Sequence, residues 1–167
     1  TINLHPSLLP CYRGPNPFFW QYYYNDLDGG VTVHYIDRGE DTGDIILQRK
    51  IPITQGATLA EAARQTMFDQ GVDLLMESID LIARGQAPRR PQPAASPTPK
   101  ARAVKFPEYP KLVDWENWPV DRIWHFLRGT EYWFNRSLHW RNGPGPRRRL
   151  AAFRPGPPER ATSAASA

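Results

Sequence analysis

The chain has 167 residues, a formal net charge of +4 and a mean hydropathy of −0.59, and its 18 prolines are concentrated toward the C-terminal half. No run of about eighteen apolar residues occurs, so no membrane span is expected, and the single cysteine, Cys11, excludes an internal disulfide framework. The chain also shows no signal-peptide pattern, which favours a cytoplasmic protein. Its first residue is Thr1 rather than methionine, which suggests a fragment.

Short strands and helices are predicted to alternate in the first part of the chain. Residues 1–4, "TINL", resemble the end of a buried strand, and the proline-broken residues 5–10 predict a loop. Asn16 and Pro17 predict the start of a helix that carries the aromatic run at 18–26. Two further strands are expected at 30–37 and 44–53, joined by an acidic turn that contains Asp41.

A long helix is predicted over residues 58–84. Thr58 and Glu61 have the spacing of a capping box, and Gly85 marks the end of the helix. An apolar stripe at helical spacing, interpreted as a packing surface, comprises Leu59, Ala63, Met67, Leu74, Leu75, Ile79 and Ile82.

The second part of the chain is rich in proline and arginine. We expect a linker at 86–104, a short helical and aromatic segment at 105–140, and a basic disordered tail at 141–167. The tail, with Arg147, Arg148 and Arg149, is a candidate for RNA binding, although a solvated segment is the favoured interpretation. The tryptophans at 115–140 are interpreted as packing residues rather than as a stacking surface for bases or sugars.

Polar side chains are dense in residues 3–14, "NLHPSLLPCYRG". Asn3 and His5 are two apart, so on a strand both project to the same side. An amide donor and a protonated imidazole directed at one point can stabilise the oxyanion of a tetrahedral intermediate. A nearby carboxylate would raise the pKa of His5 and keep it protonated. Asp41 is a candidate for this carboxylate. The alternative to a catalytic site is that Asn3 stabilises the loop and His5 has a structural role. The carboxylates that compete with Asp41 for this role are Asp37, Glu40 and Asp44.

Other catalytic patterns are absent from the sequence. No serine lies in a nucleophile elbow, Cys11 has no evident partner base, and no glycine-rich phosphate loop is present. The histidines lack the spacing of a metal site, so no metal is expected; they are His5, His34, His125 and His139. The residues therefore predict an Asn-His-carboxylate site suited to acyl or formyl chemistry.

Two segments together resemble a known family. The segment "NLHPSLLPCYRG" is similar to the signature of the folate-dependent formyltransferases, and "GVTVHYIDRGEDTGDIILQ", residues 30–48, resembles their second motif. The resemblance covers residues 1–85 well and 105–129 more loosely. It implies an α/β fold, namely the C-terminal half of a doubly wound, Rossmann-like domain whose first half would precede Thr1.

The resemblance also implies roles for individual residues. Asn3, His5 and Asp41 would be the catalytic residues, and Leu9-Pro10 is a candidate cis peptide bond. The formyl donor would be 10-formyl-tetrahydrofolate. Residues expected near this cofactor are Leu8, Leu9, Asp37, Arg38, Gly39 and Glu40. Residues expected to shape the loop or contact the acceptor are Ser7, Pro10, Arg13 and Gly14, with a structural role favoured for Arg13.

The acceptor is expected to be an amine. The bulky residues at 18–24 favour an amino sugar or another small amine, with methionyl-tRNA as the other candidate. One alternative is a hydrolase that uses water in place of the amine. A second is a truncated, non-catalytic protein whose basic tail binds RNA. The sequence predicts no oligomeric state.

Overall fold

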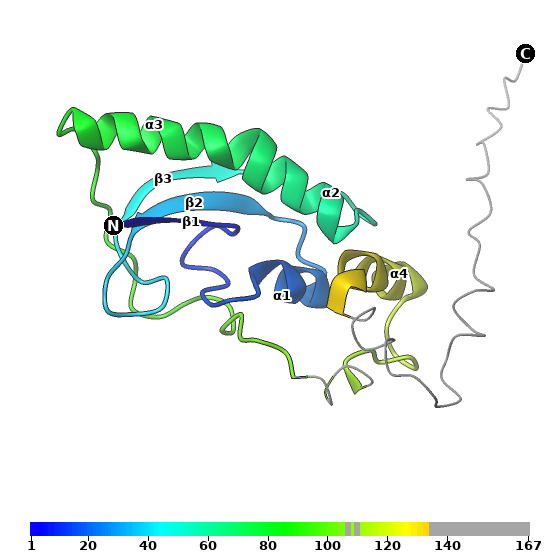
Figure 1. The fold of residues 1–167 in the computed structure, drawn as a ribbon. Coiled ribbons are helices and arrows are strands. Elements are labelled where there is room, and N and C mark those ends of the chain that lie inside the picture. Colours follow the sequence, from blue (N-terminus) through cyan, green and yellow to red (C-terminus); the bar gives the residue numbers. More distant parts are fainter. Residues whose placement is uncertain (106–107, 109–110, 134–167) are drawn as a thin grey trace, which may run out of the picture. The chain divides into compact units, whose positions relative to one another are not determined.

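A three-stranded antiparallel sheet lies at the centre of the computed structural model, which describes residues 1–105, 108 and 111–133 (Figure 1). Its strands are β1 (Ile2–His5), β2 (Gly30–Tyr35) and β3 (Ile45–Lys50), in the order β1-β2-β3. Residues 30–34 of the central strand are all buried, because β-branched side chains fill both of its faces. The expected basic tail at 141–167 and Trp140 lie outside the described residues.

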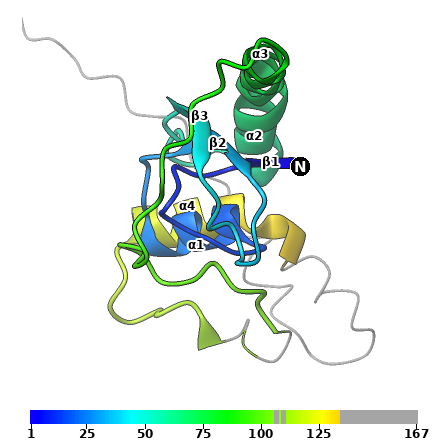
Figure 2. The ribbon, with the colours of Figure 1, turned by 90° about the vertical axis from the view of Figure 1, so that its left-hand side faces the viewer.

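Helices cover the two faces of this sheet (Figures 1 and 2). On one face lie α2 (Leu59–Ala63), the π-helical segment η1 (Arg64–Gly71) and α3 (Val72–Ala83), which follow one another without a break. On the other side, α1 (Pro17–Tyr24) packs beside α4 (Val120–Gly129). The expected α/β fold is confirmed, and the described strands are antiparallel members of it.

The predicted helix at 58–84 is confirmed, and so is its capping box, since Thr58 and Glu61 exchange hydrogen bonds at the start of α2. Its predicted buried stripe is partly wrong. Leu74 is 3% exposed, but Ile79 and Ile82 are 42% and 39% exposed. The buried residues of α3 are Leu74 and Ser78, about one turn apart, so the buried face of this helix runs through Ser78 rather than through the apolar Ile79 and Ile82.

Aromatic side chains form the core between α1 and α4. Phe19 and Tyr22 of α1 and Phe126 of α4 are fully buried. The Tyr22 ring lies 4.6 Å from that of His125, and Trp118 lies 5.3 Å from Tyr23. The bulky run that favoured a small acceptor in the sequence is therefore largely core. A second core, under α3, contains Val31, Val33, Ile46, Ile51 and Leu74.

The proline-rich residues 86–104, expected as a linker, make tertiary hydrogen bonds to the loop after β1. The N–H of Ala101 donates to the carbonyl of Arg13 at 2.7 Å, and the N–H of Tyr12 donates to Thr98 Oγ1 at 2.6 Å. The composition of this segment predicts that it cannot build a core of its own. The composition gives no information on the hydrogen bonds that the carbonyls and few polar side chains of the segment make to the rest of the protein.

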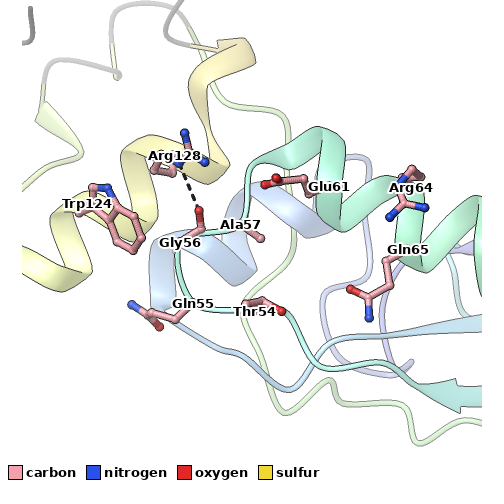
Figure 3. A pocket seen from close by; sticks show the side chains of 9 residues that line it. All are labelled: Thr54, Gln55, Gly56, Ala57, Glu61, Arg64, Gln65, Trp124 and Arg128. Carbon is pink, nitrogen blue, oxygen red and sulfur yellow. Dashed lines mark hydrogen bonds between the residues drawn. The ribbon is translucent and has the colours of Figure 1, made fainter. Parts of the chain in front are cut away.

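The loop after β3 meets α4 at Gly56 (Figure 3). The Gly56 N–H donates to Nδ1 of His125 at 2.8 Å, and Arg128 Nε donates to the Gly56 carbonyl at 3.2 Å. A hollow of about 410 Å³ lies beside this contact, between Trp124, Arg128 and Arg64. None of the candidate site residues lines it.

In the described part of the chain, none of the helices is both long and apolar enough to cross a membrane. Within the same residues, no group of three or more His, Cys, Asp or Glu side chains is placed to hold a metal ion.

Gly56 gives a test of the contact with α4. Its φ of +75° favours glycine, and a Cβ there would overlap the Trp124 ring. Gly56→Ala should therefore lower the free energy of unfolding by about 3 kcal/mol, from backbone strain plus overpacking. Gly85→Ala is the matched control, because Gly85 has a φ of +68° and nothing within 4 Å of an added Cβ. Equal losses in urea denaturation would contradict the proposed contact.

Candidate active site

Three side chains predicted to act together converge in the structure. The Asp41 carboxylate accepts a hydrogen bond from Asn3 Nδ2 at 3.4 Å through Oδ1, and its Oδ2 lies 3.6 Å from His5 Nδ1. Of the four candidate carboxylates, Asp41 is the one that contacts both Asn3 and His5. The rival Asp44 pairs instead with Arg89, at 3.3 Å.

Local structure explains why these three groups meet. β1 ends at His5, so Asn3 and His5 lie on the same side of that strand. Asp41 lies in the turn between β2 and β3 and has a φ of +56°, a left-handed conformation that is uncommon outside glycine. The N–H of Gly14, from the loop after β1, donates to Asp41 Oδ2 at 2.9 Å. The carboxylate is thus held from the opposite side of the site.

His5 is almost completely buried, with 4% of its surface exposed. Its Nε2 donates to the carbonyl of Tyr12 at 3.0 Å, which leaves Nδ1 facing Asp41. Burial lowers the pKa of His5, and the attraction of Asp41 acts in the opposite direction but is weaker. Asp41 thus acts to raise the pKa of His5, as expected, but the net shift is downward because desolvation of the imidazolium outweighs the ion pair.

Asp41 is held in its ionised form. Burial acts to raise its pKa, but contacts with His34 and His5 and the hydrogen bond from Gly14 outweigh burial, so the pKa lies below its usual value. The carboxylate is therefore charged at neutral pH.

A fourth side chain, His34 of β2, belongs to this group and was missed in the sequence. Its Nδ1 donates to the carbonyl of Tyr35 at 2.8 Å, and its Nε2 lies 3.2 Å from Asn3 Nδ2 and 3.5 Å from Asp41 Oδ1. In the β1–β2 register Asn3 is opposite His34. Knowledge of this pairing would have identified His34 as a member of the site, but the register of two strands cannot be derived from the sequence of either strand alone.

The residues expected near the cofactor fall into two groups, a pair of packed leucines and a set of exposed turn residues. Leu9 is buried, its N–H donating to Thr32 Oγ1 and its carbonyl accepting from Gln48, while Leu8 packs against Gly30. The turn residues Asp37, Arg38, Gly39 and Glu40 are exposed. Asp37 accepts hydrogen bonds from Gly39 and Thr42 within the turn, and Glu40 pairs with Lys100.

The residues expected to shape the loop after β1 form its internal bonds. Ser7 Oγ donates to the carbonyl of Cys11 at 2.6 Å, and the Pro10 carbonyl accepts from Ser96 Oγ. The Leu9-Pro10 peptide bond is cis, as expected. Gly14 has a φ of +123°, and a Cβ there would meet the backbone of Ala101.

Arg13 is buried and donates to uncharged oxygens. Its guanidinium contacts the side-chain oxygen of Gln92 and the carbonyls of Pro93 and Ala94 at 2.8–3.2 Å. These bonds agree with the structural role favoured for it.

The segment that carries this site is similar to a known protein family. Residues 1–79 match the model of the formyl transferase family. This part of the chain belongs to that family. The match contains Asn3, His5, His34 and Asp41, so the whole group of converging side chains lies within the formyl transferase segment.

The relatives of this chain carry different names. It is 34% identical over 143 residues to a methionyl-tRNA formyltransferase of Roseiflexus sp. (strain RS-1), covering 86% of this chain and 42% of the relative. It is 33% identical over 131 residues to the cytosolic 10-formyltetrahydrofolate dehydrogenase of Mus musculus, covering 78% of this chain and 14% of the relative. The chain thus spans less than half the length of either.

A solved structure also matches. The formyltransferase PseJ from Anoxybacillus kamchatkensis, in complex with UDP-4,6-dideoxy-4-formamido-L-AltNAc and tetrahydrofolate, superposes with a TM-score of 0.57 at 34% identity. The match covers 73% of this chain and 63% of PseJ.

Two of the three buried histidines, His5 and His125, predict how stability depends on pH. Burial lowers the pKa of His5 and of His125, so between pH 6.5 and their folded pKa values the unfolded state binds more protons. Their contribution to stability is complete above pH 6.5 and is lost as the pH falls, at about 1.4 kcal/mol per unit of lowered pKa. Urea unfolding at pH 7.5 and 5.5 should show this loss, and His5→Gln should reduce it. An equal loss in both proteins would contradict the assignment to His5.

Proposed function

We propose that the protein transfers a formyl group from 10-formyl-tetrahydrofolate to an acceptor amine. The observation that carries the proposal is the convergence of Asn3, His5 and Asp41 inside a segment that matches the formyl transferase family. The amine nitrogen attacks the formyl carbon and a tetrahedral intermediate forms. The bond from that carbon to N10 of the folate then breaks, N10 takes a proton, and the amine nitrogen loses one.

Asn3 and His5 are proposed to stabilise the oxyanion of this intermediate. Their contacts with Asp41, 3.4 and 3.6 Å, are long, and such contacts often tighten only when substrate is bound. Asn3 is half-buried, so its amide can turn toward a formyl oxygen. The pKa of His5 is low in the free protein, and a negative oxyanion beside the ring favours its protonated form.

Asp41 is proposed to act on protons. Because its carboxylate is ionised and lies beside His5, it stabilises the imidazolium and is available to accept, through water, the proton that the attacking amine loses. The remaining advantage comes from holding the two substrates in line.

The acceptor is proposed to be an amino sugar or another small amine. The support is the match to PseJ, whose solved complex contains a formamido sugar nucleotide. The methionyl-tRNA formyltransferase of Roseiflexus is equally similar in sequence, so methionyl-tRNA is the comparison acceptor in any assay. We also propose that the protein acts in the cytoplasm.

The assay mixes the protein with 10-formyl-tetrahydrofolate and a panel of amino sugars, small amines and charged methionyl-tRNA. Tetrahydrofolate release is followed by absorbance, and the products are identified by mass spectrometry. Formylated amine supports the proposal. Formate released at the same rate without amine would instead show a hydrolase. RNA binding without any turnover would favour the non-catalytic alternative, and that binding should weaken steeply with salt.

Asp41→Asn tests the catalytic role directly. The amide keeps the size of the carboxylate but removes its charge, so it neither stabilises imidazolium nor accepts a proton, and kcat should fall by about 10²–10⁴-fold. Asp44→Asn is the matched control from the same turn, because its carboxylate faces Arg89. Unchanged activity in Asp41→Asn, or an equal loss in both variants, would reject the assignment.

A further inference from the structure

We propose that Gln92, in the proline-rich segment, is a positioning residue that holds the Asp41 turn against the loop after β1. Its catalytic consequence rests on the proposed formyl transfer, but the positioning itself is a property of the free protein. Gln92 lies 51 residues from Asp41 and 79 from Arg13 along the chain, yet its side chain contacts both segments.

Both ends of the Gln92 amide are fully used. Nε2 donates to the carbonyl of Asp41 at 3.0 Å and to the carbonyl of Gly43 at 2.7 Å. Oε1 accepts from Arg13 Nε at 3.2 Å and from Arg13 Nη2 at 2.8 Å. A primary amide has two donor hydrogens and one acceptor oxygen with two lone pairs, so no hydrogen-bonding capacity is left over. A surface glutamine that happened to touch its neighbours would not be saturated in this way.

These bonds close a ring of contacts around the site. From Gln92 the ring runs to the Asp41 backbone, through the Asp41 side chain to the N–H of Gly14, to its neighbour Arg13, and back to Gln92. Each contact spans two segments that are distant in sequence. The ring therefore sets the distance between the Asp41 turn and the loop whose Tyr12 carbonyl holds His5.

Asp41 needs such support because of its backbone. A left-handed residue that is not glycine is strained and persists only where the surroundings hold it. Gln92 donates to the carbonyl of Asp41 and to the carbonyl of Gly43, two residues later. These two hydrogen bonds hold the turn at the strained residue and on its C-terminal side. Without these two bonds, the turn can relax and carry the carboxylate away from His5.

Arg13 and Gln92 have separable tasks in this arrangement. Arg13 donates to the carbonyls of Pro93 and Ala94 as well as to Gln92, so it anchors the segment as a whole. Of these two side chains, Gln92 is the one that donates to the Asp41 turn. A variant that keeps the acceptor but loses the donors therefore separates anchoring from positioning.

Gln92→Glu is that variant. A carboxylate of the same size still accepts from Arg13 but cannot donate to the carbonyls of Asp41 and Gly43, which it repels. Because the anchor is retained, the melting temperature should fall little, whereas kcat should fall at least tenfold with little change in KM for the amine. If Gln92 served only as an anchor, this variant would retain the activity of the parent protein.

Gln92→Met gives a readout that does not require activity. Methionine fills the same space without hydrogen bonds and adds no charge. Asp41, His34 and Glu40 are the charged or titratable groups that act on His5, and Asp41 is the strongest of the three. If the carboxylate moves away, the titration midpoint of the His5 ring, followed by NMR at its Cε1–H, should shift down by about half a pH unit.

Gln86→Met is the control, because Gln86 is an exposed residue of the same segment that is held through its backbone N–H, which donates to the carbonyl of Leu81. Unchanged His5 midpoints in folded Gln92→Met, or parental kcat in Gln92→Glu, would overturn the proposal. If the parent protein transfers no formyl group, the proposed function fails but the NMR titration still decides the positioning role.

Discussion

The Asp41 carboxylate is the group on which the rest of the site depends. Its two oxygens are approached by groups from three parts of the fold: Asn3 and His5 of β1, His34 of β2, and the N–H of Gly14 in the loop between β1 and α1. A negative charge in a largely buried place requires such partners. The sheet and the loop after β1 therefore both contact the Asp41 carboxylate.

Burial has opposite effects on the two titratable members of this site. For His5, loss of water outweighs the attraction of Asp41 and lowers the pKa, whereas for Asp41 the surrounding donors outweigh burial. The free site therefore holds a charged carboxylate beside a ring that resists protonation. In the proposed reaction, the oxyanion of the intermediate places a negative charge beside the ring, which couples protonation of His5 to formation of the intermediate.

Local patterns in the sequence were enough to predict the three strands, the capped helix after Thr58, and the grouping of Asn3, His5 and Asp41. Each of these depends on neighbours within a few residues or on motifs of known order. His34 and Gln92 could not be predicted in the same way, because their contacts depend on strand register and on a chain path of 51 residues or more. The proline-rich composition of residues 86–104 predicted that this segment has no core of its own. It did not predict the surface against which the segment lies.

The π-helical segment between α2 and α3 has a consequence for insertions and deletions. A π-turn accommodates about one residue more than an α-turn, so a deletion of one residue within 64–71 can be absorbed by converting η1 to regular α-helix. Such a change would leave the orientation of α3 nearly unaltered, because the residue lost is the one by which the wider turn exceeds an α-turn. Homologous chains that differ by one residue here would thus present the same side chains of α3 to solvent, without any change in the strands that carry the site.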